Sequence, residues 1–144
     1  MLKQSHLPVY RFDQADAQLS LLPMAARRAL DCAGLHLSLK GWQALSLDQR
    51  QALVRLGGTH RVDCARVADL LAERAADIRP TPPLTEADGA AGPSAELLQA
   101  LPTGSDLSVD RWRALRALDR YVLVQLARRG KLERLAEAYR EICE

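Results

Sequence analysis

Two cysteine–histidine pairs are the residues of this chain whose types and spacing could bind a metal ion. Three residues separate Cys32 from His36, and three separate His60 from Cys64 in the reverse order. Zinc sites use two thiolates and two imidazoles in a tetrahedral arrangement. However, we expect Gly34 to end a helix between Cys32 and His36, and neither pair has the close cysteine spacing of zinc modules. The pattern favours free cysteines and no cofactor, with a metal sensor as the alternative that a measurement of bound metal decides.

The sequence contains no pattern typical of a phosphate-binding loop or of a catalytic nucleophile. Gly57-Gly58 lacks the preceding strand, the further glycines and the lysine of a phosphate-binding loop. Nothing places a serine on the strand-to-helix turn of a nucleophile elbow. The acidic residues are scattered over faces that we expect to be polar. We therefore predict that the protein is not an enzyme.

One segment, residues 107–131, is rich in cations. They are Arg111, Arg113, Arg116, Arg120, Arg128, Arg129 and Lys131, against Asp110 and Asp119. A helix that enters a nucleic-acid groove has this kind of composition, because its cations neutralise phosphates. Aromatic residues are poorly interleaved, and the related stretch earlier in the chain is much less basic. We favour a solvated face or an acidic protein partner, with a nucleic-acid-binding helical module as the alternative.

The elements that position these residues are organised by an internal repeat. Residues 37–56 recur, shifted by seventy positions, as residues 107–126, with nine of twenty positions identical and no gap. The same shift pairs Pro23 with Pro93, Ala25 with Ala95 and Gly34 with Gly104. Self-similarity at a fixed period indicates a supersecondary unit that is used more than once. We predict two pseudo-repeats, about 23–78 and 93–143, that pack against each other.

Composition places the chain among small helical proteins. Its 144 residues are enough for one domain with a core of its own. Apolar residues make up 48%, aromatic residues only 4%, and the abundant alanine and leucine are strong helix formers. We predict an all-α bundle of six or seven helices in a single domain, 1–144, with a Pro/Gly-rich loop at 79–94. The net charge of +2, three cysteines, no signal peptide and no long apolar run indicate a cytoplasmic protein.

Capping residues locate the predicted helices. The first spans residues 23–33, with Pro23 at its first helical position and Gly34 just past its end. Ser38 begins a short helix, and the capping box Ser46-Leu47-Asp48-Gln49 begins the next, so we expect a break near residues 45–46. In the second copy Arg116 replaces the capping serine. There we predict one continuous helix over 109–129.

Apolar spacing predicts the remaining elements. Residues 61–78 read as one amphipathic helix, and residues 94–101 as a short helix capped by its serine. The last helix is expected over 132–143. At the start of the chain, residues 9–12 alternate and could lie extended, packing down through Tyr10 and Phe12.

Two residue types recur at equivalent positions of the two copies. Trp42 and Trp112 are either a paired recognition surface or large core side chains, and their helical spacing to neighbouring leucines favours the core. Arg50 and Arg120 either bind a carboxylate of a partner protein or tie their own helix to a neighbouring one. The sequence does not separate these two interpretations.

A set of residues in the first half matches a known family in order and spacing. They are Leu22-Pro23-Met24, Arg27, Leu30-Asp31, Gly34, Leu37-Ser38-Leu39-Lys40, Trp42, Gln49-Arg50-Gln51 and Leu53-Val54, with Phe12 and Ala15-Asp16 upstream. In these positions the chain resembles the nitrate reductase associated protein family. It departs from that family at Ala33, where a cysteine is usual, and at Gly57-Gly58, which replace a cysteine-bearing segment.

The resemblance implies a small cytoplasmic accessory protein of assimilatory nitrate reductase that has no established catalytic activity. We therefore expect the protein to act by docking onto nitrate reductase or its maturation machinery, and not onto a membrane, with nucleic-acid binding as the less favoured alternative. The expected contact face lies around Arg27, Arg28, Asp31 and Arg50.

Overall fold

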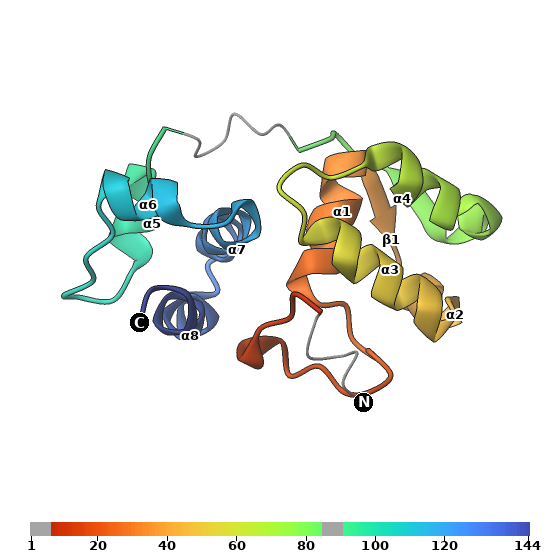
Figure 1. The fold of residues 1–144 in the computed structure, drawn as a ribbon, viewed down its shortest axis with the longest axis horizontal. Helices are drawn as coiled ribbons and strands as arrows, with labels where there is room; N and C mark the ends of the chain where they lie inside the picture. The colour runs from red at the N-terminus through yellow and green to blue at the C-terminus, as the bar shows by residue number, and fades with distance from the viewer. Residues whose placement is uncertain (1–6, 85–90) are drawn as a thin grey trace. The chain divides into compact units, whose positions relative to one another are not determined.

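The computed structural model describes residues 7–84 and 91–144. Its α-helices are α1 (Met24–Ala33), α2 (Leu39–Ala44), α3 (Leu47–Gly57), α4 (Cys64–Leu70), α5 (Ala95–Ala100), α6 (Val109–Ala114), α7 (Ala117–Arg128) and α8 (Leu132–Cys143). Two 3-10 helices, η2 (Arg11–Asp13) and η3 (Ala72–Asp77), and two strands, β1 (Leu35–Leu37) and β2 (Ile78–Pro80), complete the described elements. The predicted all-α class is confirmed, with a small antiparallel sheet added (Figure 1).

The chain divides into two compact units, Met1–Thr85 and Glu86–Glu144. The segment predicted as a loop between the repeats contributes to the first unit, because Arg79 and Pro80 lie in β2. After that strand, the backbone N–H of Leu84 donates to the carbonyl of Asp31. Residues 85–90 lie outside the described part of the chain. The single domain over 1–144 stays a prediction.

The first unit is built on α1 and α3, which lie side by side (Figure 1). Their contact is close because small residues face each other there. A β-carbon added at Gly57 would lie 1.6 Å from the carbonyl oxygen of Ala25, so only glycine fits at this crossing. Ala25, Ala26 and Ala29 are fully buried on the facing side of α1.

Residues before α1 provide its N-terminal cap. Pro23 has extended backbone angles and lies at the N-cap position, so α1 begins at Met24, one residue later than predicted. The carboxylate of Asp13 accepts the N–H of Met24 at 3.1 Å and the N–H of Tyr10 at 3.0 Å. The extended run predicted for residues 9–12 is wrong at its end, because this carboxylate folds Arg11–Asp13 into η2. Tyr10 and Phe12 are buried and stacked, which confirms that this segment packs down.

The predicted break between α2 and α3 is confirmed. The Ser38 hydroxyl accepts the N–H of Gly41 at 3.0 Å and caps α2. Ser46 and Gln49 form the predicted capping box of α3, with reciprocal hydrogen bonds of 3.1 and 2.9 Å. Between the two helices, Leu45 is extended, at φ −71° and ψ 152°.

The second unit contains the same break, so the continuous helix predicted over 109–129 is wrong. Leu115 lies between α6 and α7 with φ −72° and ψ 153°. The Asp119 carboxylate accepts the backbone N–H of Arg116 at 3.3 Å, and Arg116 Nη2 lies 2.8 Å from Asp119 Oδ1. Asp119 therefore takes the part that Gln49 has in α3, as the acceptor for the N–H of the residue before the helix. This extra break raises the number of α-helices in the described residues to eight, instead of six or seven.

The helix predicted over 61–78 is also wrong, because it is interrupted twice. The Asp63 side chain caps α4 by accepting the N–H of Arg66, so α4 begins only at Cys64. After α4 the chain tightens into η3 and then extends as β2, which pairs with β1 in the register Leu37↔Ile78. Cross-strand hydrogen bonding to a segment forty residues earlier overrides the local helical pattern.

In the second unit, α7 packs against both α5 and α8. The predicted helices over 94–101 and 132–143 are confirmed as α5 and α8. The large side chains of this unit that are fully buried are Leu97, Trp112, Leu118, Val122, Leu123 and Leu135. Among the helices described in the two units, none is long and apolar enough to cross a membrane.

Candidate functional site

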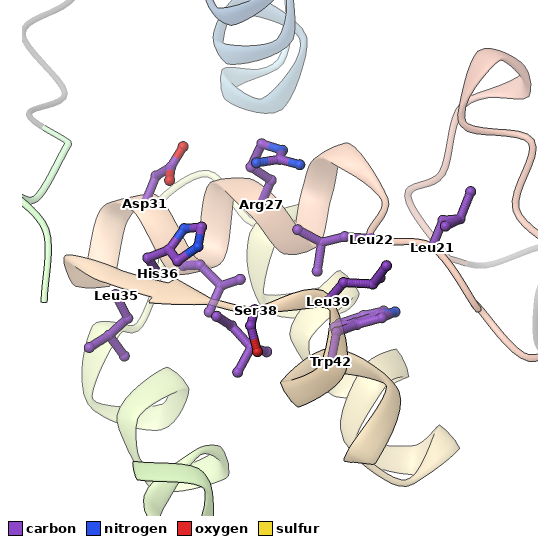
Figure 2. A pocket seen from close by; sticks show the side chains of 11 residues that line it. Leu21, Leu22, Arg27, Asp31, Leu35, His36, Ser38, Leu39 and Trp42 are labelled. Carbon is purple, nitrogen blue, oxygen red and sulfur yellow. The ribbon is translucent and has the colours of Figure 1, made fainter. Parts of the chain in front are cut away.

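A pocket of about 330 Å³ opens on the first unit between α1, β1 and α2, and we call it the α1–β1 pocket. Its lining residues are Leu21, Leu22, Arg27, Leu30, Asp31, Leu35, His36, Leu37, Ser38, Leu39 and Trp42. Arg27 and Asp31 project from α1, and His36 projects from β1 near them (Figure 2). Leu21, Leu22, Leu39 and Trp42 lie toward the other end of the pocket (Figure 2).

The apolar end of the pocket is fixed by a loop that precedes α1. Leu19 has φ 51°, a left-handed conformation that leucine rarely adopts. Its side chain is buried, and its carbonyl accepts the indole N–H of Trp42 at 2.7 Å. The carboxylate of Asp16 holds the loop from the other side by accepting the N–H and hydroxyl of Ser20, at 2.8 and 2.7 Å. The strained leucine therefore persists because several bonds fix the loop.

These bonds to Ser20 lower the pKa of Asp16 below its ordinary value of 3.8. A carboxylate whose pKa is depressed on folding stabilises the folded state above its unfolded pKa, and this contribution is lost as pH falls through the folded value. Asp16→Asn should therefore lower stability near neutral pH, with a difference from the wild type that shrinks below pH 3.8. Urea unfolding at a series of pH values measures this, and a difference that grows on acidification would contradict it.

Of the four residues predicted for partner contact, two line the pocket. Arg27 and Asp31 are half-buried and lie one turn apart on α1. Arg28 is only 3% exposed and points to the opposite side, where its guanidinium donates to the carbonyls of Gly57, Thr59 and His60. Those carbonyls lie at and beyond the end of α3, where a cation is favourable. Arg28 thus ties α1 to the end of α3.

Arg50 lies away from the pocket and binds backbone groups of its own unit. Its guanidinium donates to the carbonyls of Trp42 and Gln43, at 3.2 and 2.7 Å, and to that of Gln18. In the second unit, Arg120 donates to the carbonyls of Trp112 and Leu115, at 3.4 and 2.6 Å. Each arginine therefore ties its helix to the preceding short helix.

Both tryptophans are fully buried, which confirms the prediction that they are core residues. Trp42 forms the floor of the pocket at its apolar end. The guanidinium carbon of Arg50 lies 6.0 Å from the centre of the Trp42 ring. Trp42 is therefore fixed by Leu19, through its indole N–H, and by Arg50.

The cysteines and histidines are not gathered into one site. The Cys64 thiol lies 3.4 Å from the carbonyl oxygen of Cys32, to which it donates. His36 lies on β1, and His60 offers its backbone carbonyl to Arg28. In residues 7–84 and 91–144, no group of three or more His, Cys, Asp or Glu side chains could hold a metal ion. In the second unit, burial raises the pKa of the Cys143 thiol above its ordinary value.

Several cations of the basic segment are engaged within the second unit. Arg111 donates to the carbonyls of Asp106 and Cys143, in the latter case at 2.7 Å. Arg116 pairs with Asp119, and Arg120 holds the end of α6. The basic composition of residues 107–131 thus reflects in part the fixing of α6 and α7.

Sequence periodicity contains the signal that separates Arg27 from Arg28. Arg28 lies three residues after Ala25, on the face of α1 that packs against α3, whereas Arg27 and Asp31 share the other face. The pocket residues that the sequence did not single out are Leu21 and Leu35, and His36 was considered as a metal ligand alone.

No curated protein and no solved structure matches the chain. A family model described as conserved nitrate reductase-associated protein matches residues 9–142, which include both units. The α1–β1 pocket lies within that match, and so do the loop that fixes it and the two buried tryptophans. The chain therefore belongs to the family of conserved nitrate reductase-associated proteins.

Proposed function

We propose that this protein is a non-catalytic, cytoplasmic accessory protein that supports assimilatory nitrate reductase. It acts on the activity or the maturation of that enzyme through protein–protein contact. The family match over residues 9–142 supports this proposal, because the family is described by its association with nitrate reductase.

The α1–β1 pocket is the contact surface in this proposal. Residues on which the family resemblance rests, and which lie on three different elements, meet there: Leu22 before α1, Arg27 and Asp31 on α1, and Leu39 and Trp42 on α2. This convergence is the observation that carries the proposal. A pocket with an apolar end and a few polar groups suits recognition of another molecule.

A binding role is also supported by what the polar groups of the pocket do. The Ser38 hydroxyl is committed to capping α2, and Arg27, Asp31 and His36 are spread along one rim (Figure 2). Enzyme sites instead bring a nucleophile, a base and an orienting group within hydrogen-bond reach. The pocket therefore suits contact better than chemistry.

A protein partner is favoured over nucleic acid because arginines of the basic segment, residues 107–131, bind groups of their own unit. Arg111, Arg116 and Arg120 are bonded to groups of the second unit, so they are less available for phosphates. We expect no retention on double-stranded DNA at low salt. Retention that falls steeply as salt rises would support the nucleic-acid alternative instead.

The proposal is tested with the full chain as bait. Immobilised protein should retain nitrate reductase, or one of its maturation proteins, from extracts of nitrate-grown cells. Deleting the gene should slow growth on nitrate and leave growth on ammonium unchanged. Normal growth on nitrate, together with no retention of these proteins, would exclude the proposed function.

A further inference from the structure

The apolar end of the α1–β1 pocket exposes large side chains. Leu21 is 64% exposed and Leu39 is 53% exposed, and both line the pocket. Near them, the buried Trp42 forms an apolar floor, and the buried Leu30 also lines the pocket. Exposed leucines that border such a floor mark a surface where an apolar group of another molecule can be buried.

The polar end carries a guanidinium, that of Arg27, which has no bonding partner among the described residues. Arg28 donates to three carbonyls, whereas Arg27 makes no side-chain hydrogen bond or ion pair with any residue in 7–84 or 91–144. Arg27 is held in place by α1 and projects from it at the pocket (Figure 2). Its planar fork of donors is the group that best matches a carboxylate.

One further cation, Arg79, lies near this end of the pocket. His36 is exposed on β1 and lies directly opposite Arg79 of β2 in the sheet register. Residues that face each other across an antiparallel pair have side chains on the same side of the sheet. Arg79 therefore accompanies His36, and Asp31 is the one carboxylate among the residues lining the pocket.

We propose that the α1–β1 pocket binds a short segment of a partner protein in which a large apolar side chain lies next to a carboxylate. The apolar side chain enters between Leu21 and Leu39, and the carboxylate pairs with Arg27. The pocket volume of about 330 Å³ suits one or two side chains. This inference rests on the proposed function, because it assumes that the partner is a protein.

The probe is an array of overlapping fifteen-residue peptides that covers nitrate reductase and its maturation proteins. The full chain should bind peptides that combine Leu, Ile or Phe with a neighbouring Asp or Glu. Arg27→Glu should weaken the best such peptide at least about tenfold, because attraction becomes repulsion. Replacing the acidic residue of the peptide by lysine should restore binding to Arg27→Glu and abolish binding to the wild type.

The apolar contact is tested with a matched pair of variants. Leu39 and Val109 are both the first residue of a helix that follows a capping serine, and they are 53% and 46% exposed. Leu39→Ser should weaken the peptide at least about fivefold, whereas Val109→Ser should leave it unchanged. Arg113→Glu, at an exposed position of α6, controls for the charge reversal.

The outcomes separate this inference from the proposed function. If the wild type retains intact nitrate reductase and Arg27→Glu and Leu39→Ser retain it equally well, the pocket inference is overturned and the proposed function stands. The pocket inference also fails if the array yields only basic peptides or none, or if the lysine peptide does not rescue Arg27→Glu. Thermal unfolding of each variant at the wild-type temperature excludes loss of the fold as the cause.

Discussion

Gly57→Ala should destabilise the first unit by about 3 kcal/mol, since the added methyl group has no room at the crossing of α1 and α3. A β-carbon at this position would lie 1.6 Å from the carbonyl oxygen of Ala25 and 2.4 Å from its carbonyl carbon. Both atoms belong to the backbone, so relief requires the two helices to move apart. Urea unfolding followed by circular dichroism measures the change.

Gly92→Ala is the matched control for this substitution. A β-carbon there would approach Val109 Cγ2 at 3.4 Å, which is ordinary van der Waals contact. We expect the stability of this variant to stay within about 0.5 kcal/mol of the wild type. Loss of glycine flexibility alone would stabilise the folded state, so equal destabilisation by the two substitutions would contradict the role of the helix crossing.

Arg28→Met should cost a similar amount, about 3 kcal/mol, through a different mechanism. The methionine keeps most of the apolar stem but removes the donors that bind the carbonyls of Gly57, Thr59 and His60. These carbonyls would then be left without the cation that binds them. Arg28→Lys should recover only part of the loss, because one ammonium does not reproduce the planar fork. Urea unfolding of the three proteins provides the comparison.

The neighbouring Arg27 is the internal control for this prediction. Arg27→Met changes the same side chain on the same helix, but at the rim of the α1–β1 pocket. The free energy of unfolding of Arg27→Met should stay within about 0.5 kcal/mol of the wild type, whereas its binding of the proposed partner should be strongly weakened. A loss of stability as great as that of Arg28→Met would show that the two arginines do not divide these roles.

Local sequence signals predicted most of the helices because the helix ends are determined by nearby residues. Ser38, Ser46 and Ser94 cap helices through their own hydroxyls, and Gly34 ends α1 in the left-handed conformation. Each of these features needs no information from distant parts of the chain. The buried positions of the two tryptophans also followed from helical spacing.

The errors arose where distant or less familiar partners decide the structure. The strand β2 forms because β1 pairs with it, although residues 61–78 have a helical apolar pattern. At the break before α7 the capping position holds Arg116, and Asp119 binds its backbone N–H and its side chain. The cap of α1 comes from Asp13, eleven residues away. None of these partners is found by reading a short window.

The candidate site was predicted in part, for the same reason. Arg27 and Asp31 lie where helical periodicity places them, on the face of α1 away from α3. Arg28 lies next to a family-motif residue and Arg50 is one, but the carbonyl partners of both come from other segments. The exposure of Leu21 depends on the left-handed turn at Leu19, which a leucine does not signal.

Positions that match under the seventy-residue shift should differ between the two units in the substitutions they tolerate. It pairs Arg27 with Leu97 and Asp31 with Leu101, and both leucines are buried. An ionised side chain at position 97 would lose its hydration and have no counter-ion. At position 27 the ionised side chain of Arg27 lies at the rim of the pocket, where water reaches it. We therefore expect the fold to tolerate substitutions at positions 27 and 31, and to accept only apolar residues at positions 97 and 101.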